Sequence, residues 1–348
     1  MARIILLSVF IILSLNPTLA TDYTKYYHPY INKAELAIVD GHYEMALGIY
    51  AVTFEKVPSA FARDYFNAAV CAVKLNRYQQ ALIYCDSLIA KGVTKGFLEN
   101  EKALSTLRSF PYWSSYINTY NQKRKKIFIK AKYNDILMQL VRLEEADQVF
   151  RKMEGSYEKY GDTISAIDTR NMDTLLMIWD KYGFPGEGLV GTASPREVLP
   201  HPWIVLWHHC QLTATKGKEN LTNRLKQAVR NGHMYPVAFG RLMCAVNDNN
   251  YNLMSCGVVV LRFEDNVSPP LAEQVSEEQA IAINKKRISA GLESLNDFYR
   301  KAAFVLNGGV ARDFAFPVYD NITAIDLPTQ KHFDKMQEFV FKDINEYL

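Results

Sequence analysis

The sequence lacks several features that would place it in a familiar class of protein. After residue 20, no segment approaches the roughly 20 consecutive apolar residues that a membrane-spanning helix needs. Only five cysteines are present, an odd number spread over the chain, unlike the dense disulfide framework of a small secreted domain. Basic and acidic residues nearly balance, at 40 against 37. We therefore expect neither a membrane span nor a nucleic-acid partner.

Several catalytic and cofactor motifs are missing as well. The sequence has no G-x-S-x-G nucleophile motif and no H-E-x-x-H zinc motif. Gly186, Gly188 and Gly191 formally match the dinucleotide fingerprint, but the pattern before them is helical, whereas the fingerprint requires a strand. We interpret this segment as a glycine-rich loop and expect neither a cofactor nor a metal ion.

The first 20 residues have the pattern of an export signal. One positive charge, at Arg3, precedes an apolar run from Ile4 to Leu15, and small residues end at Ala20. The apolar run is too short to serve as a stable membrane anchor. We expect cleavage after residue 20 and a soluble mature protein that is periplasmic or secreted.

The next segment contains an internal repeat with an offset of 35 residues. The stretches that begin at Ala34 and Ala69 share small residues where helices pack closely, Gly or Asn at a left-handed turn, and Tyr two positions later. This pattern resembles the tetratricopeptide repeat, whose period is about 34 residues. A worn third unit at 97–113 is expected to cap the stack. The matched pairs are Ala34/Ala69, Ala37/Ala72, Gly41/Asn76, Tyr43/Tyr78, Ala46/Ala81 and Leu47/Leu82.

The remainder of the chain is expected to be mostly helical. The basic run at 123–126 favours a linker at 119–133 over a phosphate-binding patch. Ser276 and Gln279 can form a capping box at the start of a helix, and only 257–263 has the β-branched pattern of a strand. The predicted fold is mainly α, with repeats at 21–118, a helical domain at 134–305 containing at most a small β-hairpin, and an extension at 306–348 that ends in a helix.

Two adjacent histidines, His208 and His209, stand in an apolar helix expected at 203–213. Neighbouring residues of a helix are rotated by about 100°, so the two rings face different sides. A buried imidazole needs a hydrogen-bond partner. Spacing alone favours a core histidine over a catalytic one, and both interpretations stay open.

A set of short motifs supplies a further resemblance. Their order and spacing resemble an uncharacterised domain family of exported and cytoplasmic bacterial proteins, often joined to tetratricopeptide repeats, over residues 134–303. The motifs are D-Q-x-x-R at 147–151, D-x-x-N at 168–171, G-F-P at 183–185, V-G at 190–191, His209, Arg241, and K-R-x-x-x-G-L at 286–292.

The resemblance implies two groups of candidate site residues. A histidine, a carboxylate and an arginine can hold an anionic substrate and move a proton, or they can form a buried network that fixes the core. The candidate catalytic residues are His209, Asp168, Asn171 and Arg241. The candidate binding residues are Asp147, Gln148, Arg151 and His208.

Part of this site is expected to be degenerate. The family pattern has polar residues where this chain has Gly240, Val258 and Val259. His209 matches the histidine of the family, whereas His208 occupies its glutamine position. We therefore expect His209 to be the constrained histidine and its role to be structural.

Two functions follow from these expectations. The first is an exported binding or scaffolding protein whose repeat groove holds a peptide or protein partner, because stacked helix pairs form a concave surface. The alternative is a hydrolase-like enzyme with a His/Asp/Arg site in the second domain. A separate hypothesis places Cys71 and Cys85 close enough to pair within one helix hairpin.

Overall fold

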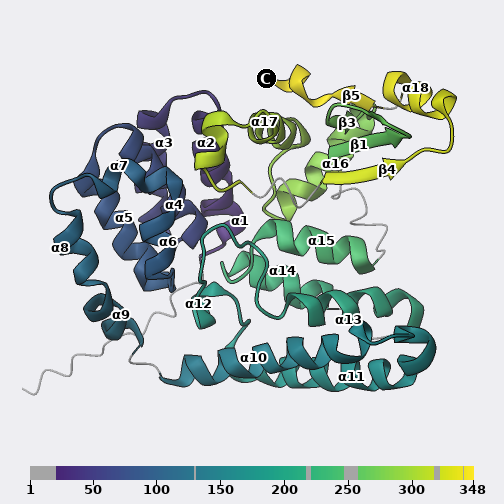
Figure 1. The fold of residues 1–348 in the computed structure, drawn as a ribbon, viewed down its shortest axis with the longest axis horizontal. Coiled ribbons are helices and arrows are strands. Elements are labelled where there is room, and N and C mark those ends of the chain that lie inside the picture. Colours follow the sequence, from purple (N-terminus) through teal and green to yellow (C-terminus); the bar gives the residue numbers. More distant parts are fainter. Residues whose placement is uncertain (1–20, 129–130, 217–220, 247–257, 317–321, 340) are drawn as a thin grey trace, which may run out of the picture.

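A computed structural model describes residues 21–128, 131–216, 221–246, 258–316, 322–339 and 341–348 (Figure 1). The expected export signal and Cys256 lie outside these ranges. The fold is mainly α, as predicted. No helix among the described residues combines the length and the apolar character needed to cross a membrane.

Two helix hairpins form the repeat segment. They consist of α2 (His28–Val39) with α3 (Tyr43–Phe54), and α4 (Ala62–Lys74) with α5 (Tyr78–Lys91). Gly41 and Asn76 have φ values of 75° and 57° in the two turns, which is the left-handed conformation expected there. The amide nitrogens one residue later donate to the carbonyls of Ala37 and Ala72, both over 2.8 Å. The two hairpins therefore repeat in geometry as well as in sequence.

The segments after the hairpins are short helices rather than a third regular pair. Most of the described part of the predicted linker at 119–133 belongs to α9, and α9 packs on α5. Lys123 pairs with Asp86 at 2.5 Å, and Arg124 donates to the carbonyl of Ile89. The helices that flank the hairpins are α1 (Tyr23–Tyr26), α6 (Lys95–Asn100), η1 (Lys102–Leu104), α7 (Ser105–Arg108), α8 (Trp113–Asn118) and α9 (Tyr120–Phe128).

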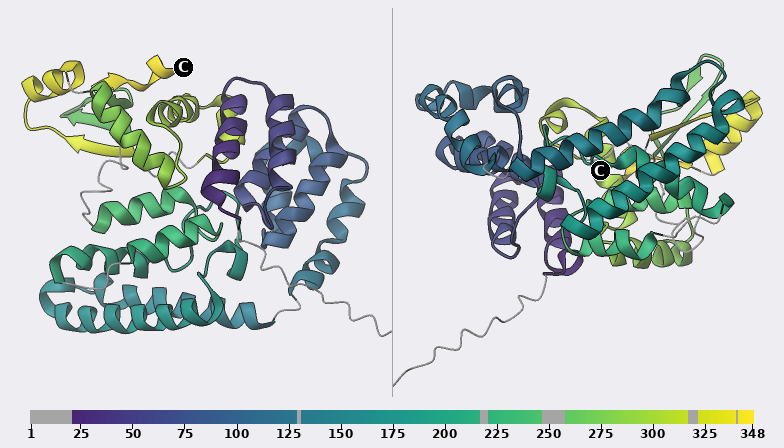
Figure 2. Two further views of the ribbon diagram at one scale, coloured as in Figure 1. Left: turned by 180° about the vertical axis from the view of Figure 1, so that it is seen from behind. Right: turned by 90° about the horizontal axis from the view of Figure 1, so that it is seen from below.

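The middle of the chain forms a separate helical layer with its own hydrophobic core. Its two longest helices, α10 and α11, lie side by side (Figure 2), and α13 packs against both of them. The helices of this layer are α10 (Ala131–Val149), η2 (Phe150–Lys152), α11 (Ser156–Tyr182), α12 (Glu187–Val190), α13 (Trp203–Lys216), α14 (Thr222–Arg230) and α15 (Pro236–Val246).

The C-terminal part adds helices and a small mixed sheet. The predicted capping box of Ser276 and Gln279 is present at the start of α16. Its helices are α16 (Glu277–Ser289), α17 (Leu295–Leu306), η4 (Gly309–Asp313), α18 (Gln330–Phe339) and η6 (Ile344–Tyr347). Its strands are β1 (Val258–Phe263), β2 (Asn266–Val267), β3 (Leu271–Glu273), β4 (Ile322–Asp326) and β5 (Phe341–Asp343).

The sheet is larger than the predicted β-hairpin. β1 pairs antiparallel with β2 and β3, and parallel with β4, while β3 pairs antiparallel with β5. The last two strands come from the C-terminal extension, where only a helix was expected. They have five and three residues, which is too short for a clear alternating pattern. Their pairing is set by β1 and β3, so local sequence does not reveal it.

The hydrophobic cores divide the predicted domain at 134–305 into two parts, because its early residues form a core of their own while most of its later ones join the core of the repeats. Buried residues of the repeats, such as Tyr27 and Phe66, share one core with Phe298 and Tyr299 of α17. The last third of the chain thus packs on the first, while most buried residues of the middle layer form a second core. The face formed by α2 and α4, which we call the α2/α4 face, is covered as a result.

The segment at 313–316 lies on this α2/α4 face. The side chain of Asn67 accepts from the backbone nitrogen of Ala315 at 2.8 Å and donates to its carbonyl at 3.2 Å. Lys74 pairs with Asp313 at 2.7 Å, and the ring of Phe314 stacks on Tyr43. Residues of the chain itself therefore cover part of the side of the repeats on which a concave binding surface was expected.

The glycine-rich loop joins the middle layer to the repeats. Glu187 accepts from the backbone nitrogen of Ala62 at 3.0 Å and from the hydroxyl of Tyr235 at 3.0 Å. A Cβ atom at Gly186 would lie 2.0 Å from the carbonyl oxygen of His233, and one at Gly191 would lie 2.9 Å from that of Lys91. Close backbone approach accounts for these two glycines.

The described cysteines are free. Cys71, Cys85 and Cys210 are buried and Cys244 is half-buried. Burial raises the pKa of the Cys71 and Cys85 thiols to about 12. The hypothesis that Cys71 and Cys85 pair is not supported, because each thiol is packed into the core as a small apolar group.

Candidate active site

Five of the eight predicted site residues meet where α10, α11 and α13 pack together. Asp147 lies in the last turn of α10 and Arg151 four residues later in η2, and the two side chains are in contact. Asp168 reaches them from α11, and His208 reaches them from α13. Gln148 donates to Asp147 over 2.7 Å. We call Asp147, Arg151, Asp168 and His208 the His208 cluster.

Arg151 joins the two carboxylates of the cluster. Its Nη2 lies 2.8 Å and 2.9 Å from the two oxygens of Asp168, and its Nη1 lies 3.2 Å from Oδ1 of Asp147. Its Nε donates to the hydroxyl of Tyr157 at 2.9 Å. Burial disfavours the charge on Arg151, but the hydrogen bonds to Asp168 and Tyr157 outweigh it and raise the pKa of the guanidinium.

His208 is held by one ring nitrogen. Its Nδ1 lies 2.9 Å from Oδ1 of Asp147, whose side chain is 1 % exposed. An ionised carboxylate only accepts hydrogen bonds, so Nδ1 carries the hydrogen and Nε2 of the neutral ring is the basic nitrogen. Among the residues that the structure describes, no group is hydrogen-bonded to Nε2. Asp147 thereby fixes both the tautomer and the orientation of the imidazole.

A pocket of about 290 Å³ lies beside the cluster. Its lining includes Arg151, Asp168 and His208, together with Tyr157 and Gln211. The His208 side chain is 14 % exposed, so the ring borders open space while its carboxylate partner is sealed. This combination can support acid–base chemistry on a molecule in the pocket.

The cluster also has the composition of a metal site. Within the described ranges, Asp147, Asp168 and His208 place their ligand atoms within 4.8 Å of one another. Arg151, however, donates to both carboxylates, so a guanidinium already supplies the positive charge that a metal ion would bring. The residues present fit an arginine better than a metal ion.

The other predicted catalytic residues lie elsewhere. Asn171 is 1 % exposed and donates to the carbonyl of Leu143 at 3.0 Å, so it ties α11 to α10. His209 is buried and does not line the pocket beside His208. Arg241 lies on α15, where it lines a different cavity. The predicted set of His209, Asp168, Asn171 and Arg241 is therefore not one site; Asp168 instead belongs with the residues predicted to bind.

Neither a protein-family model, nor a curated protein, nor a solved structure matches the chain. The chemistry of the cluster must therefore be argued from its geometry.

Two residues of the site were missed in the sequence. Gln211 follows His208 by three residues on α13, so helical spacing alone places it on the same face. Tyr157 stands at the start of α11 and contacts Arg151 only because the chain reverses between η2 and α11. Spacing was a usable signal for Gln211, whereas no local pattern identifies Tyr157.

Proposed function

We propose that the middle layer is a hydrolase-like enzyme in which His208 is the general base. The observation that carries the proposal is the 2.9 Å contact between Nδ1 of His208 and the buried Asp147, with Nε2 left available. A carboxylate that orients an imidazole in this way also stabilises the imidazolium formed when the ring takes a proton.

The proposed reaction is hydrolysis of an ester or amide bond. Nε2 of His208 removes a proton from water as the water oxygen bonds to the carbonyl carbon. The imidazolium then returns that proton to the leaving oxygen or nitrogen as its bond to carbon breaks. Water is consumed, an acid and an alcohol or amine are released, and His208 returns to its neutral form.

The charges around the pocket favour a substrate without negative charge. Asp162 and Asp168 line it beside a single cation, Arg151, and Asp147 lies behind His208. Arg151 is already paired with two carboxylates. The anionic substrate suggested by the sequence is therefore replaced, in this proposal, by a neutral or cationic one.

The sequence suggested a degenerate site because of three replaced residues, and these residues lie outside this pocket. Gly240 lies in α15 and borders the cavity that Arg241 lines, while Val258 and Val259 lie in β1. None of the three lines the His208 pocket. Their replacement removes no partner of His208, so degeneracy does not count against this site.

Hydrolysis of p-nitrophenyl acetate, a neutral ester, tests the proposal. We expect His208→Ala to lower kcat/KM by roughly 100-fold, in the range that a positioned general base contributes. His42→Ala, at an exposed histidine of the repeats, serves as the control for unspecific imidazole reactivity. Circular dichroism checks that each variant is folded. Equal rates for wild type and folded His208→Ala would sink the proposal.

The binding function expected from the repeats remains a prediction. Its support is the 35-residue register and the hairpin geometry, but the α2/α4 face is covered by α17 and residues 313–316. A peptide or protein partner would need to use another face of the repeats. Export likewise remains a prediction from residues 1–20.

A further inference from the structure

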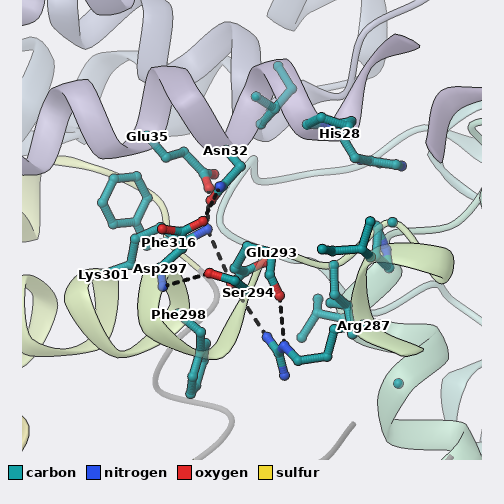
Figure 3. Close-up of a pocket in the computed structure, with 18 of the residues that line it drawn as sticks. His28, Asn32, Glu35, Arg287, Glu293, Ser294, Asp297, Phe298, Lys301 and Phe316 are labelled. Atoms are coloured by element: carbon teal, nitrogen blue, oxygen red, sulfur yellow. Dashed lines mark hydrogen bonds and ion pairs between the residues drawn. The ribbon is translucent and has the colours of Figure 1, made fainter. Parts of the chain in front are cut away.

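A second cavity, distinct from the His208 pocket, lies between the repeats and the C-terminal part. It has a volume of about 450 Å³ and is bordered by α2, α15, α16 and α17 (Figure 3). This volume lies in the range of cavities that enclose small organic ligands. We call it the α2/α17 cavity. Its apolar lining residues are Ile31, Leu36, Pro236, Val237, Ile288, Leu292, Phe298 and Phe316.

One side of the cavity is formed by five members of a chain of six alternating acidic and basic residues. Lys301 lies 2.7 Å from Glu35 and 3.2 Å from Glu293. Figure 3 shows Glu35, Glu293 and Lys301 converging between α2 and α17. In order, the chain is Asp64, Arg63, Glu35, Lys301, Glu293 and Arg287, with successive nitrogen–oxygen distances of 3.0, 3.2, 2.7, 3.2 and 3.9 Å.

The charges of this chain neutralise one another. Burial disfavours the charge of Lys301, but Glu293 and Glu35 outweigh it and raise the pKa of the ammonium. For Glu293 the neighbouring Lys301 and Arg287 likewise overcome burial and lower the pKa to about 2. The chain thus pairs three carboxyl groups with three basic groups, without an excess of either.

Two further polar residues of α2 at the cavity, His28 and Asn32, are uncharged, whereas Lys33 is basic. His28 is buried, and burial together with the nearby charge of Arg63 lowers its pKa to about 3, so the ring is uncharged near neutral pH. Asn32 donates to Asp297 at 2.9 Å. An ionised group placed beside the charge chain would have to compete for groups that are already paired with one another, which costs several kcal/mol for a buried charge.

We propose that the α2/α17 cavity binds a neutral, largely apolar small molecule. The apolar lining provides the affinity, and the closed charge chain rejects an ionised ligand. Arg241 also lines the cavity and is the group to which a carboxylate would be drawn. Comparing neutral with ionised ligands therefore shows whether the cavity prefers an uncharged molecule or a carboxylate bound by Arg241.

Binding of N-phenyl-1-naphthylamine, an uncharged fluorescent probe, tests the site. We expect a saturable rise in fluorescence with wild type, and a loss of binding in Leu292→Trp and Val237→Trp, which fill the cavity from two half-buried lining positions. Ile83→Trp, on the exposed face of α5, is the matched control and should bind like wild type. Using two filling variants keeps the test valid if one of them fails to fold. An absence of saturation, or equal binding by folded filling variants, overturns the cavity as a binding site.

Competition among three ligands of equal length tests the ligand class. At pH 7.4 we expect 1-decanol to displace the probe, and decanoate and decylammonium to be at least about tenfold weaker, because each carries a full charge. Displacement by decanoate as effective as that by decanol would overturn the neutral class and implicate Arg241. Equally effective decylammonium would overturn it as well.

Discussion

Two buried ion networks can be compared directly within this molecule. The six-membered chain at the α2/α17 cavity and the His208 cluster both contain carboxylates and guanidinium groups that are almost inaccessible to solvent. In the six-membered chain, both neighbours of each inner residue carry the opposite charge. The His208 cluster instead ends in an imidazole with one nitrogen bound and the other available.

Under the proposed function, the difference between the two networks lies in whether the network is complete. Burial and charge are common to both networks, so neither identifies chemistry by itself. What distinguishes the two networks is whether every charged or polar group in them has its partners. A closed chain holds α2, α4 and α17 together, whereas an open end that borders a pocket leaves a group able to exchange a proton.

The largest expected effect comes from breaking the closed chain. Lys301→Met leaves Glu35 and Glu293 buried without their shared cation, and we expect a loss of about 3–5 kcal/mol in the free energy of unfolding. Urea denaturation measures it. Lys285→Met, at an exposed lysine of α16, is the control and should change stability by less than about 0.5 kcal/mol. Similar midpoints for the two variants would contradict the assigned role of the chain.

Alanine substitutions at Asp147 and at His208 should lower the stability of the protein by different amounts. Asp147→Ala leaves Arg151, Gln148 and His208 without their shared acceptor, and we expect a cost of about 1–3 kcal/mol. His208→Ala removes only the open end and should cost less than about 1 kcal/mol. Thermal melts of the two variants make the comparison, and a larger loss for His208→Ala would argue for a purely structural histidine.

A smaller effect concerns acid sensitivity near the α2/α17 cavity. His28 has a folded-state pKa of about 3, below its ordinary value of 6.5, so the unfolded chain takes up the proton first. Its contribution to stability is complete above pH 6.5 and falls as the pH decreases towards 3. We expect His28→Phe to flatten the dependence of Tm on pH between 6.5 and 4.5, a window above the ordinary titration of Glu293. Parallel curves for the two proteins would refute this assignment.

The smallest expected effect is a decrease in stability as the pH rises, the opposite direction to that of His28. It comes from Glu144, whose pKa is influenced by Asp147 of the His208 cluster. Burial, and next the charge of Asp147, raise the pKa of Glu144 to about 7. The folded protein therefore holds a proton that the unfolded chain has lost, and stability decreases as the pH rises from about 4.5 through 7. Glu144→Gln should remove this decrease, as measured by Tm at pH 5 and pH 8. Asp147→Asn should lower the pKa of Glu144, which a carbon-13 carboxyl titration detects.

The sequence predicted local geometry better than long-range pairing. The turns at Gly41 and Asn76 and the capping box at Ser276 follow from residues within a few positions of one another, so they were predictable. Strands β4 and β5 were missed, because their partners lie far away in the sequence. The covering of the α2/α4 face was missed for the same reason.

The site was predicted in composition but not in arrangement. The motifs indicated Asp147, Gln148, Arg151 and Asp168, which meet in the fold, but their histidine was His209, whereas the ring that joins the cluster is that of His208. They did not separate Asn171 from Asp168, although the two are only three residues apart on α11. Whether a side chain of α11 joins the cluster depends on which neighbouring helix, α10 or α13, packs against its side of α11. A single sequence does not show this packing.

The hydrogen bonds between Asn67 and Ala315 have a consequence for synthesis of the protein. They join residues separated by 248 positions. During translation the helix hairpins are complete long before the segment that covers them has left the ribosome. Their apolar surface therefore stays exposed while most of the remaining chain is made, and during that interval a chaperone or a neighbouring nascent chain can bind it. Slow elongation between residues 91 and 315 should lower the yield of folded protein more than an equal delay after residue 316.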